Sequence, residues 1–283
     1  GGGNFSLFPL TSGGAIEIAR QTIQHSGTGP DTSRQESAHV HGTFLKKDNS
    51  TLYVTDLGTD KIMSYKFDPV KGVITPSRTA FATATPGSGP RHLAFSPSGK
   101  YVYLLEELAG MVEIFRDSSG ILKSLESVST LPETYRGFAG SAEIYLSPDG
   151  RFLYCSNRAA SNTIAIFAVN AATGRLKLAG HQETLGQTPR NFNFDPTGKF
   201  LIVANGGGRV LTLADLRALP WEERVLVQEC AGNGNHVMGS AGLRGQARWR
   251  GPSFESLLEL CGGHQPRRVR GPGRRGGQRV PRR

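Results

Sequence analysis

A pattern of residues recurs about every fifty positions through the first two hundred residues of the chain, and it constrains the fold more than any other feature. Four segments align at offsets of 50, 51 and 48 residues: HGTFLKKDNSTLYVTD (41–56), RHLAFSPSGKYVYLLE (91–106), AEIYLSPDGRFLYCSN (142–157) and RNFNFDPTGKFLIVAN (190–205). Each segment reads as an apolar strand, a tight turn and a second β-rich strand. Pro presets such a turn and Gly supplies the positive φ that it needs.

The residues between these segments complete a four-stranded unit. Third strands are expected over 61–68, 111–116 and 163–170, and fourth strands begin near Val73, Ile121 and Leu176. Four antiparallel strands per period are typical of a propeller blade, whereas a β-sandwich does not repeat at a fixed register. GGGNFSLFPL reads as a third strand of an earlier blade. The sequence therefore predicts an all-β, incomplete propeller with three full blades flanked by two partial ones.

Polar residues recur where each first strand begins. The first strand of a propeller blade lies innermost, so equivalent positions of successive blades converge around one channel. One such position holds His41, Arg91, Ala142 and Arg190, and the next holds Gly42, His92, Glu143 and Asn191. Converging cations repel one another unless an anionic ligand or acidic side chains lie among them.

A second polar set falls at the end of each second strand, at Asp56, Glu106, Asn157 and Asn205. The second strand is antiparallel to the first, so its end returns to the level where the first began. Basic and acidic groups at the same mouth of the channel indicate an anion-binding and proton-transfer site. Asn157 and Asn205 also suit a purely structural role, in hydrogen bonds between neighbouring blades.

These motifs, in order and at blade spacing, resemble a known family. AHVHGTFL, VTDLGTDKIMSYKFDP, GSGPRHLAFSPSGKYVYLLEE, GSAEIYLSPDGRFLYCSNR and TPRNFNFDPTGKFLIVAN are similar to the lactonase family, which includes propeller-type 6-phosphogluconolactonases and carboxy-cis,cis-muconate cyclases. The resemblance covers nearly all of residues 1–208. It implies a seven-bladed propeller, of which about four to five blades are present. It also implies hydrolysis of a small phosphorylated or carboxylated lactone in carbohydrate metabolism, in the pentose phosphate pathway, without a metal or organic cofactor.

The resemblance also implies site residues. The cyclase relatives use a His, a Glu and Arg residues, which carry over onto His39 or His41, Glu106 or Glu107, Arg91 and Arg190. The repeat alignment favours His41 and Glu106, so the predicted catalytic residues are His41, Glu106, Arg91 and Arg190. The predicted substrate-binding residues are His39, His92, Glu107, Asn157, Asn191 and Asn205. His39 and His41 share a strand face, but no third ligand is evident, so no metal site is predicted.

Residues 209–263 break the repeat and read as a short α+β fragment. ECAGNG and ARWRG (247–251) resemble the molybdopterin-binding domain of sulfite oxidase-like oxidoreductases, in which a Cys-x-Gly-Asn loop ligates molybdenum. The match places the ligand at Cys230, whose thiolate suits a soft metal. Asn235 stands where relatives usually place Arg. Molybdopterin is thus a cofactor only if this fragment, a small part of such a domain, is functional.

Residues 264–283 hold eight Arg and no acid, so much of the net charge of +10 belongs to this tail. A segment of Gly, Pro and Arg buries no core and is expected to be disordered. Nucleic acid is a partner only through this tail. Two unlike segments joined without a linker, followed by such a tail, are typical of a chimeric or misassembled reading frame.

The chain has no run of 18 apolar residues and no basic n-region followed by an apolar core, so neither a membrane span nor a signal peptide is expected. Three scattered cysteines favour a reducing compartment, and the expected location is cytoplasmic. The chain starts without Met, which leaves processed secretion open. Two functional alternatives to a lactone hydrolase remain: a non-catalytic propeller scaffold that binds partners through its rim, and a molybdenum oxidoreductase built around Cys230.

Overall fold

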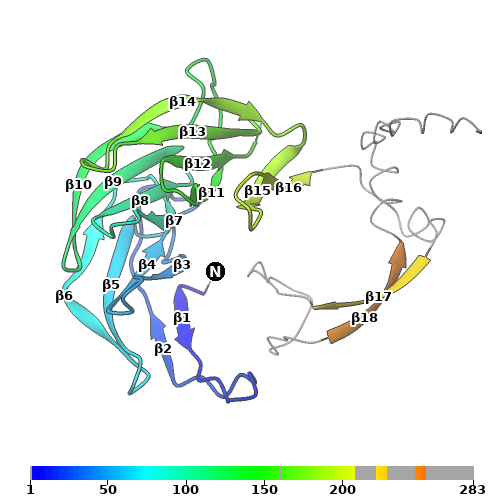
Figure 1. The fold of residues 1–283 in the computed structure, drawn as a ribbon. Helices are drawn as coiled ribbons and strands as arrows, with labels where there is room; N and C mark the ends of the chain where they lie inside the picture. The colour runs from blue at the N-terminus through cyan, green and yellow to red at the C-terminus, as the bar shows by residue number, and fades with distance from the viewer. Residues whose placement is uncertain (1, 160, 208–220, 228–245, 253–283) are drawn as a thin grey trace, which may run out of the picture. The chain divides into compact units, whose positions relative to one another are not determined.

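The computed structural model describes residues 2–159, 161–207, 221–227 and 246–252. The chain divides into two compact units, Gly1–Gly208 and Arg209–Arg283. The first unit consists of strands joined by turns, and Figure 1 shows them arranged as successive small sheets along an arc. No described residue is helical.

Three sheets of four antiparallel strands form the middle of the first unit. Each is a meander, in which every strand pairs with the next strand along the chain. Their strands are β3 (Val40–Leu45), β4 (Thr51–Asp56), β5 (Lys61–Asp68) and β6 (Val73–Thr83); β7 (Pro90–Phe95), β8 (Tyr101–Glu106), β9 (Met111–Ser118) and β10 (Ile121–Ser129); and β11 (Ser141–Leu146), β12 (Phe152–Asn157), β13 (Thr163–Val169) and β14 (Leu176–Glu183). The fourth strands start at Val73, Ile121 and Leu176, as the repeat predicts.

A two-stranded sheet stands on either side of these blades. The first pairs β1 (Asn4–Leu7) with β2 (Gln21–Gln24), and the other pairs β15 (Gln187–Phe194) with β16 (Leu201–Gly207). The prediction of three full blades flanked by two partial ones, in an incomplete all-β propeller, is confirmed. The second unit contains one described hairpin, β17 (Trp221–Val227) with β18 (Gln246–Pro252). The helices expected in 209–263 and the disorder expected in 264–283 fall outside the described residues.

The turn between the first and second strands is the same in every blade. The amide of Gly99 donates to the carbonyl of Ser96, and Gly150 and Gly198 close equivalent turns. Gly99 has a φ of 67° and Gly150 of 71°, in the left-handed region that favours glycine. The first blade has Asn49 there, with a φ of 57°. Asn tolerates this conformation better than other non-glycine residues, which explains how KKDNS replaces the Ser-Pro-x-Gly sequence.

The hydrophobic core lies between the blades rather than in one central mass. One cluster joins the second and third blades, with Tyr103 and Leu105 packed against Leu153 and Phe167. Another joins the first and second blades through Tyr53, Val102, Leu104 and Phe115, and a third joins Phe5 of the N-terminal partial blade to Leu52 and Val54. Every residue of β4 and β8 is buried, because a second strand has a neighbouring blade on each face.

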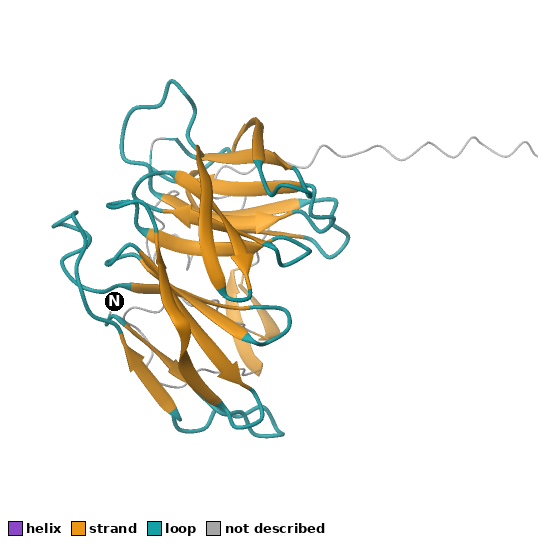
Figure 2. Cartoon of the chain, turned by 90° about the vertical axis from the view of Figure 1, so that its left-hand side faces the viewer, coloured by secondary structure: helices purple, strands orange, loops and turns teal. Residues whose placement is uncertain are grey.

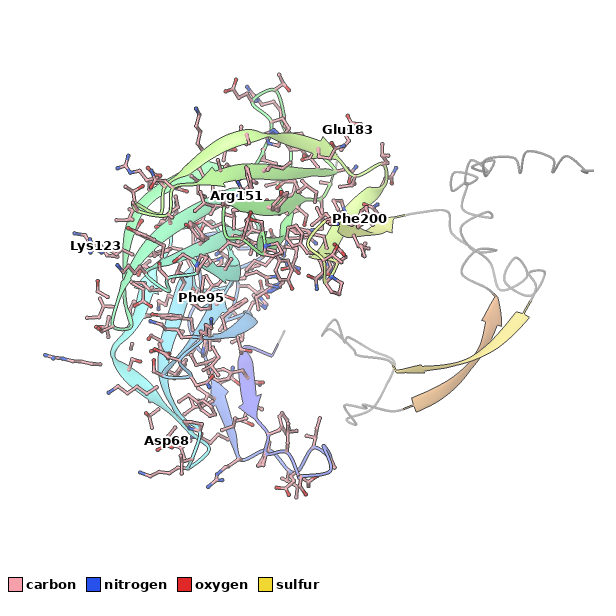
Figure 3. All side chains as sticks on the ribbon, viewed as in Figure 1. Asp68, Phe95, Lys123, Arg151, Glu183 and Phe200 are labelled. Atoms are coloured by element: carbon pink, nitrogen blue, oxygen red, sulfur yellow. The ribbon has the colours of Figure 1, made fainter. Side chains whose placement is uncertain are left out.

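The strands of each blade are ordered from the inner to the outer side of the arc, as in a propeller. In Figure 1 the first strands β3, β7, β11 and β15 lie on the inner side of the arc, and β6, β10 and β14 lie on its outer side. The view turned by 90° in Figure 2 shows the long strands of the blades stacked side by side with loops at both ends. Figure 3 shows Lys123 and Glu183 on the outer strands, whereas Phe95 lies on the inner strand β7. The starts of the inner strands therefore gather on one side of the first unit.

No helix in the described part of the chain is long and apolar enough to cross a membrane.

Candidate active site

Each inner strand carries a β-bulge near its start, and the bulge falls on the repeated polar position. In the first two blades Val40 pairs with Asp56 and Gly42 with Thr55, and Pro90 pairs with Glu106 and His92 with Leu105. His41 and Arg91 are thus extra residues without a counterpart on the second strand. Equivalent bulges lie between Ser141 and Ile144 and between Pro189 and Asn191. A bulge interrupts the alternation of side chains along a strand and changes the direction of the extra side chain. The side chains of His41 and Arg91 therefore depart from the regular alternation of their strands.

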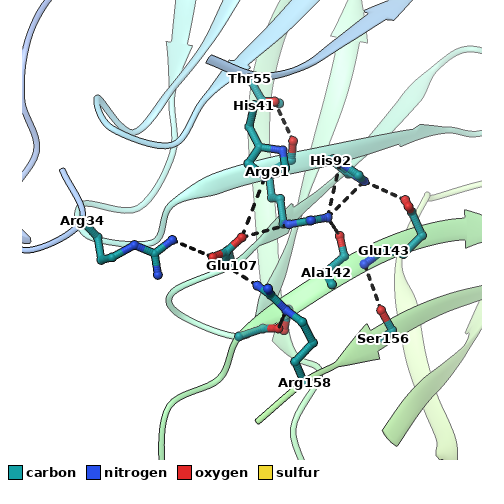
Figure 4. A network of polar contacts seen from close by, with 12 residues as sticks. Arg34, His41, Thr55, Arg91, His92, Glu107, Ala142, Glu143, Ser156 and Arg158 are labelled. Atoms are coloured by element: carbon teal, nitrogen blue, oxygen red, sulfur yellow. Dashed lines mark hydrogen bonds and ion pairs between the residues drawn. The ribbon is translucent and has the colours of Figure 1, made fainter. Parts of the chain in front are cut away.

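The re-aimed side chains meet the carboxylate of Glu107. We call this group of side chains the Glu107 cluster, and its members are Arg34, His41, Arg91, Glu107 and Arg158 (Figure 4). Arg91 Nε donates to Glu107 Oε2 over 2.9 Å, and Arg34 Nη2 donates to Oε1 over 2.7 Å. Arg158 Nη2 lies 3.1 Å from Oε1, and His41 Nε2 lies 3.9 Å from Oε2. Three guanidinium groups therefore surround one carboxylate that is only 5% exposed.

The electrostatics of the cluster keep Glu107 ionised. Burial alone raises the pKa of Glu107, but the charges and hydrogen bonds of Arg158, Arg34 and Arg91 outweigh it and lower that pKa to about 2. Both carboxylate oxygens already bind cations. Glu107 is consequently a poor proton acceptor at neutral pH and a strong fixed anion, one that orients the arginines around it.

Arg91 is the most deeply placed cation of the cluster. It is 2% exposed, and burial lowers its pKa to about 10 although Glu107 opposes that shift. Its Nη1 donates to the carbonyl of Ala142 on the next inner strand. Its own carbonyl accepts a hydrogen bond of 2.6 Å from Thr55 Oγ1. Arg91 thus remains a cation at neutral pH and is anchored to strands of three successive blades, through Thr55 on β4 and Ala142 on β11.

His41 is held in its neutral form. Burial lowers its pKa to about 3, and the charges of Arg91 and Arg190 act in the same direction. Its Nδ1 is buried and makes no hydrogen bond among the described residues. Arg190 also lowers the pKa of Arg91, so its charge acts on the same group of side chains from β15. The structure thus gathers His41, Arg91 and Arg190 at one end of the inner strands.

A second polar group, the His92 layer, consists of His92, Glu143 and Asn191 on three consecutive inner strands. His92 Nδ1 lies 2.7 Å from Glu143 Oε1, and Asn191 Nδ2 donates to Glu143 Oε2 over 2.6 Å. The layer adjoins the Glu107 cluster, because the rings of His92 and His41 meet edge to face with centroids 5.1 Å apart. The side chains of His92, Glu143 and Asn191, which the repeat alignment places at one equivalent position, therefore lie together in one connected group.

Glu106 lies outside the Glu107 cluster, so Glu107 is the one of these two carboxyls that lies near His41 and Arg91. On β8, Val102 and Leu104 face the first blade, and alternation gives Glu106 the same direction. The Glu106 carboxyl is completely buried, and neither oxygen has a hydrogen-bond partner among the described residues. Burial raises its pKa to about 8, and the nearby carboxylates of Glu113 and Asp60 add to this.

Asp56 and Asn157, at the ends of the second strands β4 and β12, make hydrogen bonds to loop residues. Asp56 accepts from the backbone amides of His39 and Gly58, at 2.8 and 3.0 Å. Asn157 is fully buried, accepts from the hydroxyl of Thr130 at 2.8 Å and donates to its carbonyl at 2.6 Å. Asn157 holds the loop before β11, which is the structural alternative that the sequence left open.

Two other predicted binding residues, His39 and Asn205, make hydrogen bonds to residues that are not part of the Glu107 cluster. His39 Nε2 lies 2.9 Å from Glu36 Oε1, and the His39 backbone amide donates to Asp56. Asn205, at the edge of β16, donates to the carbonyl of Thr184 over 3.3 Å. Of the two histidines, His41 is the one whose ring lies near Glu107, with Nε2 at 3.9 Å from Oε2.

Two members of the cluster, Arg34 and Arg158, are not among the site residues predicted from the sequence. Arg158 follows Asn157 directly, and it stands 51 residues after Glu107, so the repeat offset would have found it if the register had been moved by one residue. Arg34 comes from the loop between β2 and β3, outside the repeat, and no periodic signal marks it. The described residues contain no group of three or more His, Cys, Asp or Glu side chains placed to hold a metal ion.

With this geometry in view, comparison with known proteins decides the family. The family described as Lactonase, 7-bladed beta-propeller, matches residues 1–215. The chain belongs to the lactonase family. A 6-phosphogluconolactonase of Formosa agariphila is 38% identical over 207 residues, and that of Bacillus subtilis is 35% identical over 206 residues. These matches cover 71% and 72% of this chain.

Solved structures of related proteins share the fold of this chain. A periplasmic gluconolactonase of Pseudomonas aeruginosa superposes with a TM-score of 0.67 at 35% identity and covers 71% of this chain. A protein from Lactobacillus plantarum gives the same TM-score at 40% identity. The lactonase chain spans 58% and 57% of the lengths of the Formosa and Bacillus relatives, and 56% of the Pseudomonas structure.

A second family, described as Oxidoreductase molybdopterin binding domain, matches residues 199–275, which confirms the second resemblance. Within this match, 247–251 lies in β18, whereas Cys230 and its loop lie outside the described residues. The described strands β17 and β18 contain no cysteine. The described part of this segment thus offers no thiolate with which to test the fit of a molybdenum cofactor.

Proposed function

We propose that the chain is the site-bearing part of a lactone hydrolase that acts on an anionic sugar lactone, with 6-phosphogluconolactone as the first substrate to test. The observation that carries the proposal is the Glu107 cluster, in which three arginines converge on one carboxylate beside a neutral histidine. The names of the relatives support the same reaction class. A phosphate or carboxylate group on the substrate would meet a site in which three arginines share one carboxylate.

The arginines have donors left for a ligand. Arg91 uses Nε for Glu107 and Nη1 for the Ala142 carbonyl, and Arg158 uses Nε for the Gly140 carbonyl. A guanidinium carries five N–H groups, so each arginine retains donors for an anionic oxygen. Because Glu107 fixes their orientation, these donors are in place before the substrate arrives, which is the requirement for stabilising an oxyanion.

The reaction itself needs a water molecule and a proton acceptor. The water oxygen bonds to the lactone carbonyl carbon while one of its protons passes to a base. The negative charge that develops on the carbonyl oxygen is stabilised by Arg91. The ring C–O bond then breaks, and the departing oxygen takes a proton to give the open hydroxy acid. Glu107 suits an orienting role better than a basic one, since its pKa is about 2.

The purified chain is expected to accelerate hydrolysis of 6-phosphogluconolactone above the spontaneous rate, measured by acid release at constant pH. Gluconolactone, which lacks the phosphate, tests the role of the anionic group and should give a higher KM. A chain that binds lactones without turnover would instead be a binding scaffold, and absence of turnover on every lactone tested would refute the proposal.

Replacing Arg91 with Ala is expected to lower kcat/KM by about tenfold or more, because a charge-assisted hydrogen bond to the developing oxyanion is lost. Steady-state kinetics on the same lactone measure this. Arg151→Ala is the matched control, since Arg151 pairs with Asp149 in the exposed turn between β11 and β12. An Arg91→Ala chain with unchanged kcat/KM would remove Arg91 from the mechanism.

A further inference from the structure

The His92 layer has the construction of an acid–base pair. Glu143 lies on β11 and is 6% exposed, and each of its two oxygens is engaged. Oε1 accepts from the backbone amide of Ile144 at 3.1 Å and faces His92 Nδ1 at 2.7 Å, and Oε2 accepts from Asn191. A carboxylate held by two further donors cannot rotate away from the imidazole. The pair is therefore rigid before any ligand binds.

The partner of each ring nitrogen sets the tautomer of His92. An ionised carboxylate only accepts hydrogen bonds, so Nδ1 of His92 carries the hydrogen and Nε2 carries the lone pair. A carboxylate behind an imidazole fixes this tautomer and stabilises the imidazolium that forms when Nε2 takes up a proton. The geometry thus gives His92 both an available lone pair and a countercharge for the proton that it would accept.

Arg91 Nη1 is shared between the two ring nitrogens of His92, in long contacts that Figure 4 draws as dashed lines. Arg91 Nη1 lies 3.3 Å from Nδ1 and 3.3 Å from Nε2. A donor in line with the Nε2 lone pair would be much farther from Nδ1, so the guanidinium stands against the ring rather than in front of Nε2. The His92 side chain is 22% exposed, which leaves it accessible to water. A carbonyl oxygen bound by Arg91 would consequently lie next to a water molecule bound by His92.

His41 is less suited to take up a proton. The groups that face it are Arg91, His92, Glu107 and Arg190, of which only Glu107 favours a positive charge on its ring. Glu107 is itself shared by three arginines, and its Oε2 lies 3.9 Å from His41 Nε2. The groups that contact His92 are Glu143, Arg91, His41 and Phe44, and one of them is a carboxylate at hydrogen-bond distance.

We propose that His92 is the catalytic base of the hydrolysis proposed above, on which this inference rests, and that Glu143 is its positioning residue. A water proton passes to Nε2 of His92 as the water oxygen bonds to the carbonyl carbon. When the ring C–O bond breaks, the imidazolium returns that proton to the departing oxygen. The products are the open hydroxy acid and His92 in its starting form.

His92→Gln tests the base directly. Gln keeps a donor for Glu143 but cannot take up a proton, so kcat should fall about a hundredfold or more while KM changes little. His181→Gln is the matched control, because His181 lies on the outer strand β14, where its ring contacts the carbonyl of Thr130. Circular dichroism and thermal melting establish that each variant is folded. An active wild-type chain whose His92→Gln variant keeps the wild-type kcat overturns this inference alone.

Glu143→Gln tests the positioning role with a readout that a merely structural residue would not move. Loss of the countercharge should shift the acid limb of the pH profile of kcat to lower pH. Glu143→Asp keeps the charge, so its acid limb should lie nearer to that of the wild type. Nitrogen-15 NMR of the imidazole should show His92 with hydrogen on Nδ1 in the wild type and a changed spectrum in Glu143→Gln. A wild-type chain inactive on every lactone refutes the proposed function. A His92 with hydrogen on Nε2 refutes the acid–base pair whether or not the chain is active.

Discussion

Replacing Glu107 with Ala is expected to lower the free energy of unfolding by about 3–5 kcal/mol, because a buried cation loses its countercharge. Arg91 is 2% exposed and depends on Glu107 Oε2, and Arg34 and Arg158 share Oε1. Their mutual repulsion is uncompensated once the carboxylate is removed. The same change should raise KM for an anionic lactone, because the arginines lose their fixed orientation.

Urea unfolding of the two chains at neutral pH measures this effect. Glu126→Ala is the matched control, since Glu126 lies 3.7 Å from Arg175 on the surface, and an exposed pair contributes about 0–1 kcal/mol. Equal stability of Glu107→Ala and the wild type would contradict the buried network described here.

The stability contributed by protonated Glu106 is expected to disappear as the pH rises. Burial raises its pKa from 4.5 to about 8 in the folded chain, so the folded state holds the proton more tightly than the unfolded state. The contribution is fully present below pH 4.5 and is lost as the pH rises through about 8. Because one pKa unit corresponds to roughly 1.4 kcal/mol, a loss on the order of several kcal/mol is expected.

Glu106→Gln should abolish this loss, because the amide keeps the shape of the carboxyl without ionising. Urea unfolding at several pH values between 5 and 9 gives the slope of stability against pH for each chain. Glu133→Gln, on an exposed loop, controls for the removal of one acidic group. A wild-type slope as flat as that of Glu106→Gln would show that Glu106 already ionises freely in the folded state.

The adjacent residues Glu106 and Glu107 show why the site could be predicted only in part. Both are acidic, Glu106 ends β8 and Glu107 follows it directly, and the family resemblance fits either. The difference lies in what each faces. Glu106 continues the face of Val102 and Leu104 toward the first blade, whereas Glu107 faces the arginines. The sequence shows alternation along a strand, but it does not show which face meets a neighbouring blade and which meets the site.

The bulges are the second feature that the sequence left hidden. They occur at the same position in four inner strands, so the repeat alignment matches them to one another and shows no irregularity. The alignment could therefore name His41, Arg91 and Arg190 as equivalent without indicating how their side chains are aimed. Arg34 was beyond reach for a different reason, since it comes from a loop outside the repeat and meets Glu107 only through the packing of blades.

The sequence by itself determined the blades, because the repeat of strand and turn residues is a local property: alternation sets each strand, and Gly or Asn in the left-handed region sets each turn. It also determined that polar residues of successive blades meet at one end of the inner strands. Only the tertiary structure decided which of them make contact. Ion pairs such as Arg158 with Glu107 join residues 51 positions apart. Their distances depend on how the blades stack and on one extra residue in each inner strand.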